Sequence, residues 1–308
     1  MELMKVNLIN ENNEYVQSAN TLFHFMGRRT YLEQALKLKA LVPRYCDEDI
    51  SYLHIKVNDK EKNTISVLQK CFCDVPFHNL TNCFQIVVDE KEMNSLSDDE
   101  KEKTRNFNTH TDVYGEYAIA FSKKWGEERG LQPIHYLNVE SEYVNTLRNF
   151  IQYAFELDNL SDQVFDRLIA ELAFIKPLRG QMTRKFDSGK EIHFTKNFHD
   201  ENEWRYVPSS ERMESENISN IMVNPYLRKE KSRVNSQIQK DEYQDIWLKF
   251  DYEDIKYIIV PNISDRLELL NYINDLPEEV FNDRLPVQIQ KSLLMSRILV
   301  LNEIRGDW

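Results

Sequence analysis

Three short segments, far apart in the chain, each place polar side chains within an apolar, strand-like run. They are Phe23–Phe25, Tyr114–Ser122 and Glu203–Val207. A polar group on such a strand costs free energy unless a partner satisfies it. The three segments therefore predict one shared cleft, built where distant parts of the chain meet.

The scarcity of glycine limits which folds this chain can adopt. Only seven glycines occur among 308 residues, and none forms a glycine-rich phosphate loop. This argues against a P-loop nucleotide hydrolase and against a dinucleotide-binding βαβ fold. Strand-like and helical runs are instead mixed without βαβ regularity, which predicts the α+β class.

Apolar residues at period two and at helical spacing place the regular elements. Strands are predicted at 22–26, 52–57, 69–74, 117–121, 133–139, 191–195, 203–207, 246–250 and 255–260. Helices are predicted at 31–41, 143–155, 164–173 and 264–275, with a final strand and helix at 293–306. Together they predict a single domain over residues 1–308, with a charged, loop-like insertion at 88–113 and a polar excursion at 209–241.

The overall charge is acidic. The chain has 39 basic and 51 acidic residues, and its net charge of −12 gives no general attraction to nucleic acid or to an anionic membrane. Basic residues nevertheless gather in 27–44 and 227–240, where they are either solvated helix faces or guides for phosphate groups. No apolar run approaches about 18 residues and no signal segment occurs, so the sequence predicts a cytoplasmic protein without a membrane span.

His24 and the charged residues near position 203 each allow two interpretations. His24 shares a strand face with two apolar residues, where it is either a half-buried histidine bonded to backbone or a donor to a sugar hydroxyl. Glu203 and Arg205 lie opposite two aromatic residues that pack into the core, so the acid and the base face either a cleft or each other. Glu201 adds a second acid two residues before Glu203.

Cysteine and histidine residues between positions 71 and 83 have the ligand chemistry of a zinc site. They are Cys71, Cys73, His78 and Cys83. Their spacing fits no standard zinc motif, and a cysteine pair on a core strand is ordinarily a pair of small buried residues. We therefore predict no metal site here and no secreted disulfide framework.

The order of several motifs resembles that of the AbiGi-type abortive-infection family of bacterial phage-defence proteins. The motifs are Leu22–Phe25, Pro43–Cys46, Cys71–Pro76, His110 followed by Tyr114-Gly115-x-Tyr117, Ser122–Gly126, Glu203–Val207 and Tyr257–Pro261. The resemblance runs from about residue 21 to residue 261. The chain departs from the family in its charged insertion at 88–108 and in having Ala118 and Ala120 where glycine is expected.

The layout of this family is similar to that of the ADP-ribosyltransferase fold, a split mixed or antiparallel sheet with flanking helices that grips NAD. The resemblance implies three catalytic residues, His24, Tyr117 and Glu203. It also implies that NAD is held by His24, Arg28, Arg44, Tyr45, Tyr117 and Ser122. In this interpretation Glu203 stabilises the positive charge that builds on the ribose as nicotinamide leaves, and Tyr117 stacks on the nicotinamide ring.

The resemblance leaves two functions open. The first is an ADP-ribosyltransferase toxin that transfers ADP-ribose from NAD to RNA or DNA, or else to protein, and that is restrained by a cognate antitoxin protein. The alternative follows the family's antitoxin label and is a non-enzymatic binding protein that neutralises a partner toxin. A third function, a metal-dependent nuclease, lacks a compact acidic metal constellation in the sequence.

Overall fold

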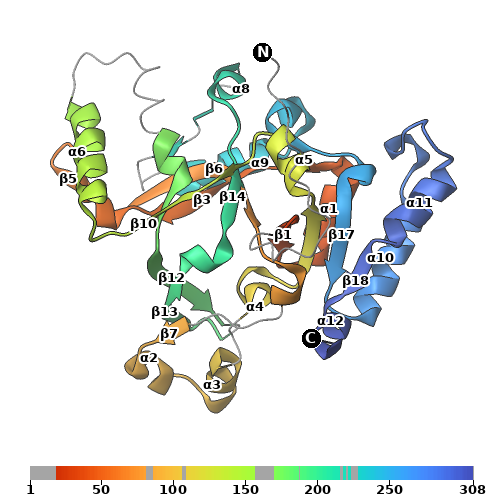
Figure 1. Cartoon of the computed structure of the whole chain (residues 1–308), viewed down its shortest axis with the longest axis horizontal. Coiled ribbons are helices and arrows are strands. Elements are labelled where there is room, and N and C mark those ends of the chain that lie inside the picture. The colour runs from red at the N-terminus through yellow and green to blue at the C-terminus, as the bar shows by residue number, and fades with distance from the viewer. Residues whose placement is uncertain are drawn as a thin grey trace, which may run out of the picture.

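The computed structural model of the chain describes residues 19–80, 86–105, 109–156, 170–186, 188–215, 218–219, 221–222 and 228–307. Helices and strands are mixed along the chain, so the predicted α+β class is confirmed (Figure 1). The central element is a sheet of nine strands. The finer expectation, an ADP-ribosyltransferase fold, stays a prediction.

The central sheet draws its strands from the whole described chain. Its order is β18 (Ile298–Val300), β17 (Ile255–Val260), β8 (Tyr117–Phe121), β1 (Leu22–Met26), β6 (Thr64–Cys73), β14 (Glu203–Tyr206) and β9 (Gln132–Pro133), with β3 (Arg44–Asp49) and β15 (Ile221–Met222) also paired to β6. Neighbours along this path are antiparallel, except for the parallel pair β17 and β18. The sheet is therefore mixed, with β1 and β6 near its middle.

Helices pack against one face of this sheet. They are α1 (Arg29–Leu38), α5 (Lys123–Glu128), α10 (Ile263–Asp275) and α11 (Val287–Met295). Leu22 and Met26 of β1 belong to the same core as these helices, whereas Phe23 packs with Ala118 and Ala120 in a second core. This alternation confirms the period-two pattern of the first strand.

The remaining elements form smaller layers beside the sheet. β12 (Arg179–Lys185), β13 (Glu191–Asn197) and β7 (Ile86–Val88) make a three-stranded antiparallel sheet, and three short pairs are β2 (Ala40–Leu41) with β16 (Leu248–Lys249), β4 (Ile55–Val57) with β5 (Lys60–Lys62), and β10 (His135–Leu137) with β11 (Ile175–Pro177). The other helices are α2 (Glu90–Asn94), α3 (Asp98–Arg105), α4 (His110–Tyr114), α6 (Glu142–Glu156), α8 (Ser210–Ser215), α9 (Arg228–Gln237) and α12 (Leu301–Asp307). Figure 1 shows α6 at one end of the long axis and α10 and α11 at the other.

The two charged segments are more regular than the sequence predicts. The segment 88–113, expected to be a loop, contains α2, α3 and most of α4. Acidic residues in the first turn and basic residues in the last turn of α2 and α3 complement the helix dipole, which favours short helices even without an apolar stripe. The described part of 209–241 likewise contains α8, β15 and α9.

Several predicted boundaries are wrong. The strand expected at 133–139 is divided into β9 and β10, and the strand expected at 246–250 shortens to β16. The last strand begins at Ile298, because α11 extends to Met295. Of the helix expected at 164–173, positions 164–169 lie outside the described residues. The remaining positions belong mostly to a 3-10 helix, Glu171–Phe174.

Gly115 allows α4 and β8 to follow each other directly beside β1. Its φ is 112°, in the region that favours glycine. A Cβ atom at this position would collide with the carbonyl group of Met26. This glycine therefore lets the chain enter β8 in register with β1, where Tyr117 pairs with Met26.

Strands β1 and β6 are paired at one point and separate beyond it. Their only pair of facing residues among the described positions is Phe23 with Cys73. The part of β6 from Thr64 to Gln69 pairs with β3 instead. Between these pairings the Cys71 carbonyl is bonded to the Nδ1 of His24 at 2.8 Å. His24 therefore stands where the central strands diverge.

Candidate functional site

The candidate site is a buried polar network on one face of β6 and β14. Glu203 faces Cys73 and Arg205 faces Cys71 in the strand register, so the acid and the base project to the same side. The two aromatic residues that alternate with them, Trp204 and Tyr206, pack with the main core on the other side. This arrangement is the one that the strand pattern predicts.

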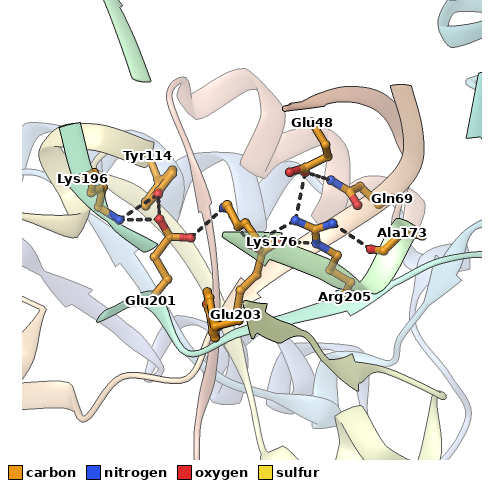
Figure 2. Close-up of polar contacts among 10 residues, drawn as sticks. Glu48, Gln69, Tyr114, Ala173, Lys176, Lys196, Glu201, Glu203 and Arg205 are labelled. Carbon is orange, nitrogen blue, oxygen red and sulfur yellow. Dashed lines mark hydrogen bonds and ion pairs between the residues drawn. The ribbon is translucent and has the colours of Figure 1, made fainter. Parts of the chain in front are cut away.

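Arg205 is fully buried and its guanidinium is saturated with acceptors. Its Nε donates to Glu203 at 2.6 Å, and its Nη1 donates to the Ala173 carbonyl at 2.7 Å. Its Nη2 forms an ion pair with Glu48 at 3.0 Å, and Glu48 also accepts from Gln69 at 2.7 Å. Figure 2 shows the guanidinium held between these groups. Arg205 therefore pairs with the acid two residues away and ties β14 to β3.

Two lysines complete the network around Glu201 and Glu203. The Nζ of Lys176 lies 3.1 Å from Glu201 and 3.0 Å from Glu203, and so bridges the two carboxylates. Lys196 and the hydroxyl of Tyr114 both bond the other oxygen of Glu201 (Figure 2). The Lys196 Nζ also donates to the Tyr114 hydroxyl at 3.1 Å. Residues from β11, β13, β14 and α4 thus converge on one pair of acids.

The charges in this network balance. Three carboxylates and three cations take part: Glu48, Glu201, Glu203, Lys176, Lys196 and Arg205. Burial alone would raise the pKa of Glu203, but Arg205 and Lys176 outweigh it and hold that pKa well below the usual range. Glu203 is therefore ionised at neutral pH, and its 3% exposure shows a carboxylate already enclosed by its partners.

His24 is neutral in the folded protein. Burial, with a further contribution from Lys70, lowers the pKa of His24 from 6.5 to about 3. Because a carbonyl only accepts, the bond to Cys71 places the proton of the neutral ring on Nδ1. The Nε2 atom is then an acceptor, so His24 can accept a hydrogen bond from a sugar hydroxyl rather than donate one. The bond to the Cys71 carbonyl also agrees with the first interpretation of His24, a half-buried histidine bonded to backbone.

The depressed pKa of His24 predicts a loss of stability in mild acid. The unfolded chain binds a proton at this residue near pH 6.5 and the folded chain only near pH 3, so stability falls as the pH drops through that interval. Between pH 7 and pH 5 this residue should lower the free energy of unfolding by about 2 kcal/mol. Urea unfolding at the two pH values should show a smaller loss in His24→Gln. The matched substitution of an exposed histidine, His135→Gln, should leave the loss unchanged, and an equal loss in all three proteins would contradict the prediction.

His24 and Glu203 line the same cavity. It has a volume of about 440 Å³, and Tyr114, Lys176 and Glu201 also line it. The residues predicted from the first and the late strand therefore line one cavity, on the side of β6 that carries Cys71 and Cys73.

Tyr117 and Ser122 lie elsewhere among the described residues. The Tyr117 hydroxyl donates to Asp265 of α10 at 2.6 Å, and burial and this carboxylate raise the pKa of Tyr117 to about 12. Ser122 caps α5 by accepting from the backbone of Trp125 at 3.1 Å. Neither side chain is among those that line the His24–Glu203 cavity. Tyr114, three residues before Tyr117, occupies the place beside Glu201.

The three remaining predicted NAD contacts are also separated from Glu203. Arg28 is exposed immediately before α1. Tyr45 is buried in a different core and its hydroxyl bonds the Ser219 carbonyl. Arg44 lines a second cavity of about 380 Å³, which shares His24 with the first. The structure thus places His24 and Glu203 on one cavity, and none of the other predicted site residues lines it.

Comparison with known proteins shows two matches. Residues 83–261 match the family model described as "Putative abortive phage resistance protein AbiGi, antitoxin". A curated protein of Lactococcus lactis subsp. cremoris, named "Abortive phage resistance protein AbiGi", is 31% identical over 284 residues, which are 87% of this chain and 100% of that protein. The chain belongs to the AbiGi family.

Membership of the AbiGi family confirms the resemblance that the motifs predict. No solved structure matches the chain, so the likeness to ADP-ribosyltransferases rests on the layout of the motifs alone. Within the part of the chain that the structure describes, no helix combines the length and apolar character needed to cross a bilayer.

Most of the partners of the two acids are not predicted from the sequence. Lys196 follows Ile192 and Phe194 at period two on β13, and all three are buried. A lysine in phase with buried apolar residues was the available signal. Lys176 lies between buried Ile175 and Pro177 on β11, and Glu48 lies in the acidic second half of β3. Neither position shows this pattern, and the fold brings both to this AbiGi-family site.

No metal site is found in the described residues. No group of three or more histidine, cysteine or acidic side chains in a metal-binding arrangement occurs among them. Cys73 is buried and Cys71 half-buried, both as free thiols, in agreement with the core interpretation. Cys83 and the side chain of His78 lie outside the described residues.

Proposed function

We propose that this AbiGi-family chain acts in abortive phage resistance as an antitoxin-like protein, which neutralises a partner toxin by binding it. The observation that carries the proposal is the family match, because that family is described as an antitoxin. The curated relative named as an abortive phage resistance protein supports the same cellular role.

The polar network is consistent with a binding scaffold. Both oxygens of Glu203 accept from Arg205, and one of them also faces Lys176. Glu201 is equally enclosed by two lysines. Charges that satisfy each other in this way fix the relative positions of β3, β11, β13 and β14, which is a structural task that needs no substrate.

A surface for the partner is offered by α10 and α11. Five large apolar side chains on these helices and their connection are 40–57% exposed: Ile263, Leu267, Leu285, Ile289 and Leu293. Helices α10 and α11 contact each other, and exposed apolar side chains gathered on neighbouring helices are typical of protein–protein interaction sites. We refer to these five residues as the α10–α11 face.

Acidic residues border the α10–α11 face. Asp275, Glu278, Glu279 and Asp283 are exposed on and after the end of α10. The basic residues beside the face, Arg266 and Arg284, each lie within ion-pair distance of a glutamate. A toxin with an apolar patch and a basic rim would match both features. Charge complementarity therefore favours a basic partner at this face.

ADP-ribosyl transfer is a second candidate, supported by one specific observation. His24 and Glu203 line the same cavity of about 440 Å³, which lies within the usual size range of small-molecule sites. In this mechanism the bond between nicotinamide and ribose breaks, and Glu203 stabilises the charge on the ribose while the acceptor attacks. Glu203 would first have to release Lys176 or Arg205.

One pair of measurements separates the two functions. We expect the chain alone to be harmless when expressed in a bacterial host, and to restore growth when co-expressed with its cognate toxin. We also expect no transfer when the purified protein is incubated with labelled NAD and total RNA, DNA or protein. Growth arrest by the chain alone, together with label transfer that is lost in His24→Gln, would reject the antitoxin function and support the enzyme.

A further inference from the structure

A second cavity adjoins the first at His24 but has the opposite electrostatic character. It has a volume of about 380 Å³ and shares His24, Phe25, Cys46 and Tyr114 with the first cavity. The first cavity is lined by five acidic residues, Asp47, Glu48, Asp49, Glu201 and Glu203, whereas the second has none among its described lining residues. Because the chain has a net charge of −12, a cavity without carboxylates among its described lining residues is a candidate site for an anionic ligand.

Two cations line this second cavity. Lys70 comes from β6 and Arg44 from the start of β3. Successive residues of β6 point to opposite sides, so Lys70 faces away from Gln69 and Cys71, which line the acidic cavity. Lys70 and the acidic residues therefore lie on opposite sides of β6, whereas Arg44, which faces Gln69 in the register, is an exposed residue at the start of β3.

Lys70 differs from the other enclosed cations of the site. Each of these, Lys176, Lys196 and Arg205, pairs with a carboxylate. No carboxylate of the described residues lies within ion-pair distance of Lys70 or Arg44. Burial and the neighbouring Arg44 lower the pKa of Lys70 to about 8, while the thiol of Cys46 acts in the other direction. The ammonium is still mainly protonated at pH 7, so it is a half-buried positive charge without a countercharge.

The cavity also lies between the two segments in which basic residues gather, 27–44 and 227–240. Its walls come from residues 27–44 on one side and from Asn235 and Gln239, within 227–240, on the other. Asn235 accepts from the backbone of Tyr45 through its Oδ1 at 2.8 Å, which leaves its Nδ2 group as a donor. The remaining wall is apolar and aromatic, including Phe25, Leu38 and Leu41.

We propose that this cavity binds a nucleotide, with its phosphate group between Lys70 and Arg44 and its base against the apolar wall. The phosphate supplies the countercharge that the described residues do not provide, and charge-assisted bonds to Lys and Arg are the strong class of hydrogen bond. The amide of Asn235 provides a further donor. This site does not depend on the proposed antitoxin function, because binding of a nucleotide at Lys70 and Arg44 requires no partner toxin.

Calorimetric titration of the full chain with ADP, inorganic pyrophosphate and adenosine tests the site. We expect ADP to bind, pyrophosphate to bind more weakly, and adenosine, which lacks phosphate, to bind least. Lys70→Met should weaken ADP binding about 10- to 100-fold, since it removes one charged hydrogen bond. Lys249→Met removes the same charge from an exposed site on β16 and should leave ADP affinity unchanged.

Three outcomes would overturn this proposal: no binding of ADP at millimolar concentration, equal binding of ADP and adenosine, or equal affinity in Lys70→Met. Melting curves of the variant without ligand establish that it is folded. The result is independent of the toxin test, since a chain that fails to neutralise a toxin can still bind ADP through Lys70. It is equally independent of label transfer from NAD, because binding requires no reaction.

Discussion

Replacing Arg205 with methionine should lower the free energy of unfolding by about 3–5 kcal/mol. Methionine preserves much of the side-chain volume but removes every donor of the guanidinium, which now serves Glu203, Glu48 and the Ala173 carbonyl. Glu203 would be left in a buried position with Lys176 as its remaining cation. An uncompensated buried charge is among the few defects that produce losses of this size.

Denaturant unfolding at pH 7 measures this effect, and Arg284→Met is the matched control. Arg284 also pairs with a glutamate, Glu253, but its side chain is 67% exposed, and pairs of this kind contribute about 0–1 kcal/mol. The double variant Glu203→Gln with Arg205→Met should be less destabilised than the sum of the single variants, because neither charge is then orphaned. Similar small losses at Arg205 and Arg284 would show that the buried network contributes little.

Converting the α10–α11 face from apolar to basic should abolish neutralisation of the toxin. The double variant Leu267→Arg with Ile289→Arg removes two exposed apolar contacts and introduces two positive charges opposite the expected basic partner. Each lost central contact can weaken binding by about 2 kcal/mol or more, so the affinity should fall more than about 100-fold. Both side chains are about half exposed, and folding should therefore change little. Affinity of the purified pair and growth under co-expression measure the outcome.

Helix α6 supplies the control for this prediction. It exposes Tyr143 and Tyr153, each 60% accessible, at the opposite end of the molecule (Figure 1). Tyr143→Arg with Tyr153→Arg makes the same charge change on a comparable apolar surface and should leave neutralisation intact. If the α6 variant fails and the α10–α11 variant works, the partner binds at the other end of the chain.

The parts of the fold that the sequence predicts well are those with a complete local pattern. The strand at 22–26 and the strand at 117–121 agree with the structure residue for residue, because each alternates between two buried faces of the central sheet. The helix predicted at 264–275 agrees to within one residue, since Asn262 caps it and its apolar residues recur at helical spacing. Local pattern and tertiary environment coincide in these three elements.

Other parts depend on contacts that no local pattern contains. Helix α1 ends at Leu38, before the end predicted from Pro43, because Lys39 takes a left-handed conformation with φ of 49° and the chain enters β2. The strand pattern correctly predicts that Glu203 and Arg205 share a face, but it does not contain Lys176 or Lys196. These lysines reach the acids only through the pairing of β10 with β11 and of β12 with β13.

The position of β1 and β6 sets a limit on how the chain can be shortened. Both strands precede residue 83, where the family match begins, yet they lie between β8 and β14 in the central sheet. A fragment cut to 83–261 would lose the strands that join its two flanks, together with His24 and Lys70. We therefore expect that the matched segment does not fold on its own, and that truncated forms need the preceding strands as part of the same piece.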